Sequence, residues 1–117
     1  MAKTTWKKNK YHAVKYTLGG ETFDSQKEAY RWQELRVLLA HGEISDLRRQ
    51  VPYQLIPSQK DVLGHVIERP VTYVADFVYT DKDGEEVVED VKGMKTREYV
   101  LKRKMMLYIH GIRVREV

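Results

Sequence analysis

The stretch that decides the fold of this 117-residue chain is YVADFVYTDKDGEEVVEDVKG, from Tyr73 to Gly93. Its first half is rich in valine and aromatic residues like a β-strand, DKDG is a turn sequence, and the second half is again strand-like. Asp76 interrupts the first strand, and acidic residues followed by a lysine end the second. Carboxylates brought together in a half-buried place repel each other and lose hydration. The hairpin therefore indicates a site for a divalent metal ion.

The turn decides which of these acids face each other. If the three residues after Asp81 form the loop, with Gly84 in the left-handed conformation that closes a bulge, Asp81 pairs with Glu85. Counting back along both strands then pairs Asp76 with Asp90. Carboxylates directly opposite each other across two strands are close enough for one small cation to bridge them.

Side-chain alternation assigns the remaining residues of the second strand to its two faces. Lys92 lies on the same face as Asp90, whereas Glu89 points to the opposite face. A four-residue loop would shift the register by one position and exchange the roles of Asp90 and Glu89. We therefore predict Asp90 as the second carboxylate and keep Glu89 as its alternative.

The segments on either side of the hairpin predict an α/β domain. Capping and stop residues predict helices from Ser25 to about His41 and from Arg97 to His110. Strands are expected at Gln50–Ile56, Val71–Thr80, Glu85–Val91 and Ile112–Val117. A leading hairpin is expected at Tyr11–Thr17 and Glu21–Phe23. The segment Ser58–Arg69 is expected to be a polar connection, either a hairpin extension or a mobile loop. The expected sheet is mixed and mostly antiparallel, in the order helix, three strands, helix, strand. Residues 1–10 are expected to be a basic, flexible arm before a single domain at residues 11–117.

The apolar positions of the two helices predict which sides face the sheet. In the first helix they are Ala29, Trp32, Leu35 and Leu39. In the second helix they include Val100, Leu101, Met105 and Tyr108.

Composition limits the function classes. Apolar residues make up 42% and charged residues 32% of the chain, which is typical of a globular domain. No apolar run approaches the ~20 residues of a membrane span, so we expect a cytoplasmic protein. Because the chain has no cysteine, a metal would have oxygen or imidazole ligands, which favours Mg²⁺ or Mn²⁺.

The formal net charge is +4, and the charges are arranged in blocks. Two basic blocks flank the acidic hairpin, an arrangement that suits a polyanion approaching a bound cation. A solvated surface is the simpler explanation of any one charge run. Candidate DNA contacts are Lys7, Lys8, Lys10, Arg48, Arg49, Gln50, Lys95, Lys102, Arg103 and Lys104.

In its acidic residues and lysine the chain resembles the PD-(D/E)xK nuclease superfamily. The pattern of that superfamily is a glutamate on the first helix, an aspartate on a core strand, and (D/E)-x-K on the next strand. Here these are Glu28, Asp76 and Asp90-Val91-Lys92. More narrowly, the chain is similar to a small phage-encoded branch of this superfamily, related to transposon-end and junction-resolving endonucleases. The segments that carry this similarity are FDSQKEAYRWQEL, VTYVADFVY, VVEDVKG and the helix containing LKRK. The resemblance implies a restriction-endonuclease-like core.

The resemblance also implies roles for these residues. Asp76, Asp90 and the Val91 carbonyl would bind the metal, Lys92 would be the catalytic lysine, and Glu28 would bind the metal directly or through water. The proline that often precedes the first aspartate is Ala75 here. Glu28 has an alternative explanation, because with the Ser25 cap its carboxylate would form a capping box.

These observations together predict an Mg²⁺-dependent DNA endonuclease in which water attacks the phosphodiester directly. A branched or structured phage DNA would suit a chain without a visible base-reading motif, and a homodimer would suit cleavage of both strands. The alternative is a catalytically silent DNA-binding accessory protein of replication, recombination or packaging on the same fold. A third interpretation is a structural protein that binds a protein partner.

Overall fold

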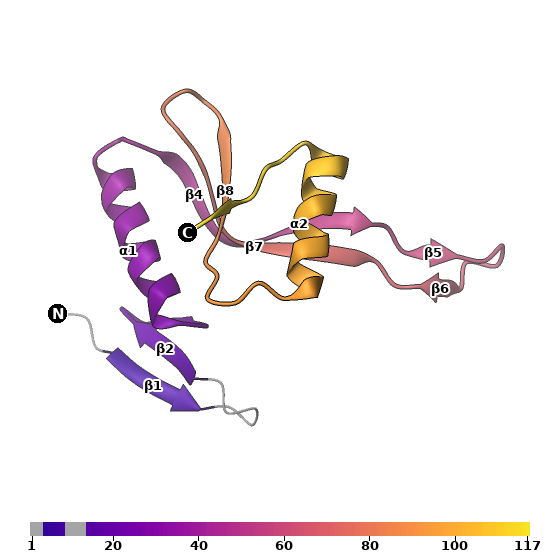
Figure 1. Ribbon diagram of the computed structural model, residues 1–117, viewed down its shortest axis with the longest axis horizontal. Helices are drawn as coiled ribbons and strands as arrows, with labels where there is room; N and C mark the ends of the chain where they lie inside the picture. The colour runs from indigo at the N-terminus through magenta and orange to yellow at the C-terminus, as the bar shows by residue number, and fades with distance from the viewer. Residues whose placement is uncertain (1–3, 9–13) are drawn as a thin grey trace.

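A four-stranded sheet forms the centre of the computed structural model, which describes residues 4–8 and 14–117, with side chains from Lys15 onward. The strand order is β4 (Ser45–Ile56), β7 (Val71–Thr80), β8 (Glu86–Asp90), β9 (Arg115–Glu116) (Figure 1). The β4–β7 and β7–β8 pairs are antiparallel, and β9 is parallel to β8. The predicted mixed, mostly antiparallel α/β architecture is thus confirmed.

The turn between β7 and β8 has the predicted three-residue loop. The Asp81 amide donates to the Glu85 carbonyl at 2.9 Å, and Gly84 has a φ of 82°. A residue with a side chain adopts that conformation only at a cost, so glycine favours this loop. The ladder places Phe77 opposite Glu89, which is the register predicted from the sequence.

The two helices begin and end where their capping residues predict. The Ser25 hydroxyl accepts a hydrogen bond from the Glu28 amide at the start of α1 (Gln26–Ala40). The Thr96 hydroxyl does the same for the Tyr99 amide at the start of α2 (Arg97–His110). Gly111, with a φ of 67°, ends α2.

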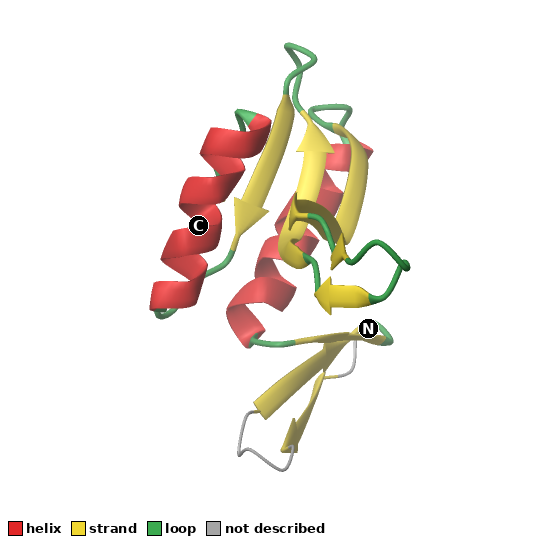
Figure 2. Cartoon of the chain, turned by 90° about the vertical axis from the view of Figure 1, so that its right-hand side faces the viewer, coloured by secondary structure: helices red, strands yellow, loops and turns green. Residues whose placement is uncertain are grey.

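The helices pack on opposite faces of the sheet, because neighbouring residues of one strand belong to different core clusters (Figure 2). Val78 lies in the cluster with Tyr99 and Met106 of α2, and Phe77 lies in the cluster with Leu35 of α1. The Trp32 ring stacks on Phe77 with centroids 5.7 Å apart. Each helix therefore covers its own face of the hairpin that carries Asp76 and Asp90.

Three of the predicted inward-facing residues are exposed, so those predictions are wrong. They are Leu39, Leu101 and Tyr108, and Tyr108 is 91% exposed. In α2 the sheet contacts Tyr99 and Met106 instead, one heptad apart on the same side of the helix. The phase of each helix is set by the sheet against which it packs, and the apolar residues alone do not specify it.

A second sheet precedes α1. It has the order β1 (Thr4–Lys8), β2 (Val14–Leu18), β3 (Glu21–Phe23), and the predicted leading hairpin corresponds to β2 and β3. Half of the segment expected to be an arm forms β1, which pairs antiparallel with β2. Tyr16 and Phe23 pack on Ala29 of α1 and so join this sheet to the rest of the core.

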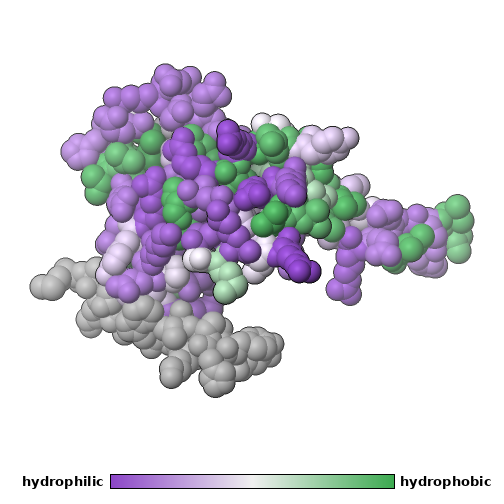
Figure 3. All heavy atoms as spheres, in the orientation of Figure 1, coloured by the Kyte–Doolittle hydropathy of each residue, from purple (hydrophilic) through white to green (hydrophobic). Residues whose placement is uncertain are grey.

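A hairpin of β5 (Gln59–Lys60) and β6 (Val66–Glu68) projects from the end of the main sheet (Figure 1). This is the hairpin extension expected for the polar connection. All residues from 57 to 70 are exposed, and apolar side chains, including Val62 and Leu63, lie at its tip (Figure 3). No helix of the described residues is long and apolar enough to cross a membrane.

Candidate functional site

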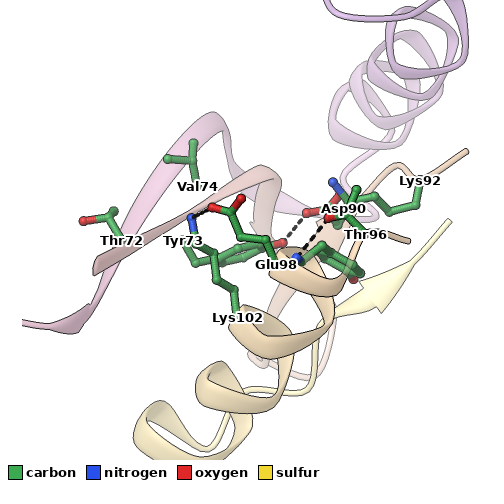
Figure 4. A pocket seen from close by; sticks show the side chains of 9 residues that line it. Thr72, Tyr73, Val74, Asp90, Lys92, Thr96, Glu98 and Lys102 are labelled. Carbon is green, nitrogen blue, oxygen red and sulfur yellow. Dashed lines mark hydrogen bonds and ion pairs between the residues drawn. The ribbon is translucent and has the colours of Figure 1, made fainter. Parts of the chain in front are cut away.

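The end of β8 carries a deeply buried acid of the predicted site. Asp90 is 2% exposed, and its Oδ2 atom accepts a 2.5 Å hydrogen bond from the Tyr73 hydroxyl. Its Oδ1 atom lies 3.0 Å from Lys92 Nζ (Figure 4). The Lys92 contact lacks hydrogen-bond geometry, so Oδ1 is buried without a hydrogen-bond partner. The Lys92 ammonium offsets the charge of Oδ1 without a hydrogen bond, and a bound metal ion would coordinate this oxygen directly.

Asp76 lies beside Asp90 on the neighbouring strand. The Val91 amide donates to Asp76 Oδ2 at 2.8 Å, which links the strand end to this carboxylate. The pKa of Asp76 is raised to about 7, first by burial and then by the nearby carboxylates of Glu28 and Asp90, while the hydrogen bond from Val91 opposes the shift. The structure therefore concentrates negative charge here without compensating it fully.

Glu28 reaches the same place from the first turn of α1. It is buried, and its Oε1 atom accepts a hydrogen bond from Gln50 Nε2 at 3.2 Å. Burial, Asp24 and to a smaller extent Asp90 raise its pKa, and Arg49 opposes them. The Ser25 half of the capping box is present, but the Glu28 carboxylate is directed toward β4 and β7.

Lys92 is held at the edge of the site. Its ammonium lies 3.0 Å from Asp90 Oδ1 and 4.5 Å from the centre of the Tyr99 ring. Its side chain is 29% exposed, so solvent and a ligand can reach it. The cation–π contact and the ion pair orient the ammonium beside the carboxylates.

Glu89, the alternative to Asp90, lies on the opposite face, as the register predicts. It is completely buried and bonded by the Arg31 guanidinium in a fork, with Nε to Oε1 at 2.8 Å and Nη2 to Oε2 at 2.7 Å. The Tyr79 hydroxyl also donates to Glu89. Both oxygens are therefore engaged in joining α1 to β8, away from Asp76.

A hollow of about 280 Å³ opens beside Asp90 and Lys92 (Figure 4). Polar side chains from β7 and from the start of α2 line it, among them Thr72, Thr96 and Lys102. Lys102 forms an ion pair with Glu98 at 3.1 Å on its rim. Of the four predicted catalytic residues, Asp90 and Lys92 line the hollow.

The donor set fits a hard cation. Asp76 and Asp90 offer carboxylate oxygens, and Mg²⁺ is usually held by one or two carboxylates with several waters. Within the described part of the chain, no three His, Cys, Asp or Glu side chains form a ready group that could hold an ion. The buried Oδ1 atom of Asp90, which accepts no hydrogen bond, and the raised pKa of Asp76 are the two features that favour a cation between these strands.

The predicted DNA-binding residues are dispersed, and several have protein partners. Arg49 packs over the Phe23 ring at 4.0 Å and donates to the Thr22 carbonyl at 3.1 Å, which ties β4 to β3. Arg48 pairs with Asp46 at 3.4 Å. Gln50 contacts Glu28 and Asp76.

The basic residues around α2 differ in accessibility: Lys95 is exposed, whereas Lys102 and Arg103 are partly buried. Lys95 and Arg103 both pair with Glu116, at 3.2 Å each. Lys104 is exposed. The side chains of Lys7 and Lys8 and the whole of Lys10 lie outside the described residues.

The sequence reasoning missed Tyr73 and Lys27. The Lys27 ammonium, on the residue of α1 directly before Glu28, donates to the Lys92 carbonyl at 3.4 Å. Tyr73 escaped notice because strict alternation places it on the other face from Asp76. In the structure β7 changes its buried face at Asp76: Tyr73 and Ala75 lie in the α2 cluster, whereas Phe77 and Tyr79 lie in the α1 cluster.

One protein family matches almost the whole length of the chain. The chain belongs to the family described as "Protein of unknown function (DUF1064)", whose model matches residues 8–115. Neither a curated protein nor a solved structure matches the chain.

Proposed function

We propose that this protein is a metal-dependent DNA endonuclease that hydrolyses phosphodiester bonds. The observation that carries the proposal is the convergence of Asp76, Asp90 and Glu28 from three elements, with the Lys92 ammonium 3.0 Å from the buried Oδ1 atom of Asp90. Acids and a lysine in this arrangement supply a cation site and a positive group for a phosphate. The resemblance to the PD-(D/E)xK superfamily gives the same residues the same roles.

Asp76 and Asp90 would hold Mg²⁺ or Mn²⁺, with the Val91 carbonyl as a further ligand and Glu28 binding directly or through water. Such an ion lowers the pKa of water and neutralises charge on a phosphate. The Tyr73 hydroxyl fixes Asp90 by its Oδ2 atom, whereas Oδ1 contacts the Lys92 ammonium and accepts no hydrogen bond. Lys92, steadied by the Tyr99 ring, would stabilise charge on the scissile phosphate or orient the attacking water.

DNA is the proposed polyanion. Lys95, Lys102, Arg103 and Lys104 lie on or next to α2, which borders the hollow beside Asp90, and would bind neighbouring phosphates. The proposed substrate is a branched or structured phage DNA. The proposed active form is a cytoplasmic homodimer, because two copies of the site would cut both strands.

Cleavage of supercoiled, linear and four-way-junction DNA with Mg²⁺ or Mn²⁺ tests the proposal. Asp76→Asn and Lys92→Ala should each lower the rate by about 100-fold or more, since each removes charge stabilisation in the site. Asp83→Asn, an exposed acid in the loop of the same hairpin, is the matched control and should cut at the wild-type rate.

Two outcomes would contradict the proposal. Undiminished cleavage by both site variants would show that the activity lies elsewhere. DNA binding by the wild type without cleavage of any substrate would favour the accessory protein, and lack of DNA binding at low salt would favour a protein-binding role.

A further inference from the structure

Gln50 has an unusual backbone conformation in the middle of β4. Its φ is 50°, in the left-handed region that residues other than glycine rarely adopt. The positions on either side are regularly paired, Arg49 with Phe77 and Val51 with Ala75. The irregular position is therefore the one opposite Asp76, where β7 also changes its buried face. Strain of this kind concentrates at functional sites.

The side chain of Gln50 lies between two carboxylates. Its Nε2 atom is 3.2 Å from Glu28 Oε1 and 3.4 Å from Asp76 Oδ1. Ionised carboxylates only accept hydrogen bonds, so the NH₂ end of the carboxamide must face them. One neutral group with two N–H donors thus joins the acids of α1 and β7.

This contact differs from the two roles that the sequence alone suggests for Gln50. A side chain that touches DNA would present its amide away from the protein, whereas this amide is bonded to two acids of the same chain. Nor does Gln50 merely begin a strand, because β4 already starts at Ser45 and Gln50 lies in its middle. The conformation is explained if the backbone turns the carboxamide toward the acids.

We propose that Gln50 belongs to the metal site as an exchangeable group, an inference that rests on the proposed function. Without a cation, its NH₂ group holds the Glu28 and Asp76 carboxylates together. Rotation about the last side-chain bond exchanges the NH₂ group for the carbonyl oxygen. An amide oxygen is a ligand type that hard cations accept, so Gln50 both preserves the empty site and binds the ion that fills it.

Mn²⁺ binding to the full-length chain, measured by isothermal titration calorimetry without DNA, tests this role. Gln50→Gly is the informative variant because glycine adopts the observed φ without strain and the fold is retained. It should bind Mn²⁺ about 10-fold more weakly than the wild type. Gln50→Glu, which supplies a charged oxygen in the same place, should bind at least as tightly as the wild type.

Asp46→Gly is the matched control. Asp46 is the other described residue of β4 with a positive φ, 51°, and it contacts Arg48 rather than the site. Its replacement relieves the same backbone strain and should leave Mn²⁺ affinity within about twofold of the wild type. Thermal unfolding in EDTA verifies that each variant is folded.

The possible results separate this inference from the function on which it rests. If Gln50→Gly binds Mn²⁺ as tightly as the wild type or more tightly, the Gln50 amide only occupies the space between the carboxylates. This result would overturn the role of Gln50 as a metal ligand and would leave the proposed metal site intact. Equal weakening by Asp46→Gly would assign the effect to the β4 backbone and would also overturn it. Absence of Mn²⁺ binding by the wild type would overturn the metal site and the role of Gln50 together.

Discussion

Replacing Asp76 by asparagine should stabilise the metal-free protein at neutral and alkaline pH. The pKa of Asp76 is raised from an ordinary value of 3.8 to about 7, so the folded state binds the proton more tightly than the unfolded state. Well below pH 3.8 both states are protonated and the carboxyl does not destabilise the fold. The cost grows as pH rises from 3.8 to 7 and is constant above 7.

The magnitude follows from the same shift. A change of this size corresponds to about 4 kcal/mol at full effect. Because solvent reaches part of Asp76, and because Glu28 and Asp90 keep their charges beside the new residue, we expect about 2 kcal/mol. Asparagine keeps an oxygen that can accept the hydrogen bond from the Val91 amide, and it loses only the longer, 3.4 Å contact with Gln50 Nε2.

Urea unfolding in EDTA, followed by tryptophan fluorescence at several pH values, measures the effect. The variant and the wild type should have equal free energies of unfolding near pH 4 and should differ by about 2 kcal/mol at pH 8. With saturating Mn²⁺ at pH 8 the order should reverse, because only the wild type retains both carboxylates for the ion. Asp83→Asn should follow the wild type throughout.

A stability difference that does not vary with pH would refute the reasoning. It would mean that the substitution acts through packing or the Val91 hydrogen bond, and that Asp76 is not held in an unfavourable charged state. Greater stability of the variant at pH 8 that persists in saturating Mn²⁺ would separately refute the metal-binding role.

Two further predictions concern parts of the fold outside the carboxylate site. Glu89→Gln should lower the free energy of unfolding, measured in urea, by about 3 kcal/mol, because it leaves the Arg31 guanidinium without its buried counter-charge. The control is Glu85→Gln, which replaces an exposed acid of the same hairpin and should have little effect. An equal loss of stability in both variants would contradict the argument from the buried ion pair. Replacing residues 60–67 by a short turn should change the melting temperature by no more than about 3 °C by calorimetry, because this hairpin buries no side chain. A larger fall would mean that the hairpin contributes to the stability of the fold.

Much of the local structure follows from short sequence signals. Ser25 and Thr96 mark the starts of the helices, and Gly111 the end of the second, because each supplies a cap that the adjacent backbone needs. Gly84 selects the three-residue loop, and the loop fixes the strand register. The separation of Asp90 from Glu89 could therefore be predicted.

Other features depend on contacts between distant parts of the chain. The exposure of Leu101 and Tyr108 follows from how α2 lies on the sheet. The Arg31–Glu89 fork joins residues 58 positions apart, and neither residue alone predicts it. Thr4–Lys8 forms a strand because β2 offers it a pairing edge.

The sequence by itself determined the order of the elements and the alternation that brings Asp90 and Lys92 to one face, since both follow from turn geometry and the two-residue period of a strand. Only the tertiary structure decided that Glu28 of α1 is directed toward these strands, that Tyr73 reaches Asp90, and that Gln50 lies between Glu28 and Asp76. These contacts arise where β4 leaves regular conformation and β7 changes its buried face. Local propensities cannot specify such a position, because it is stabilised by groups from three separate elements.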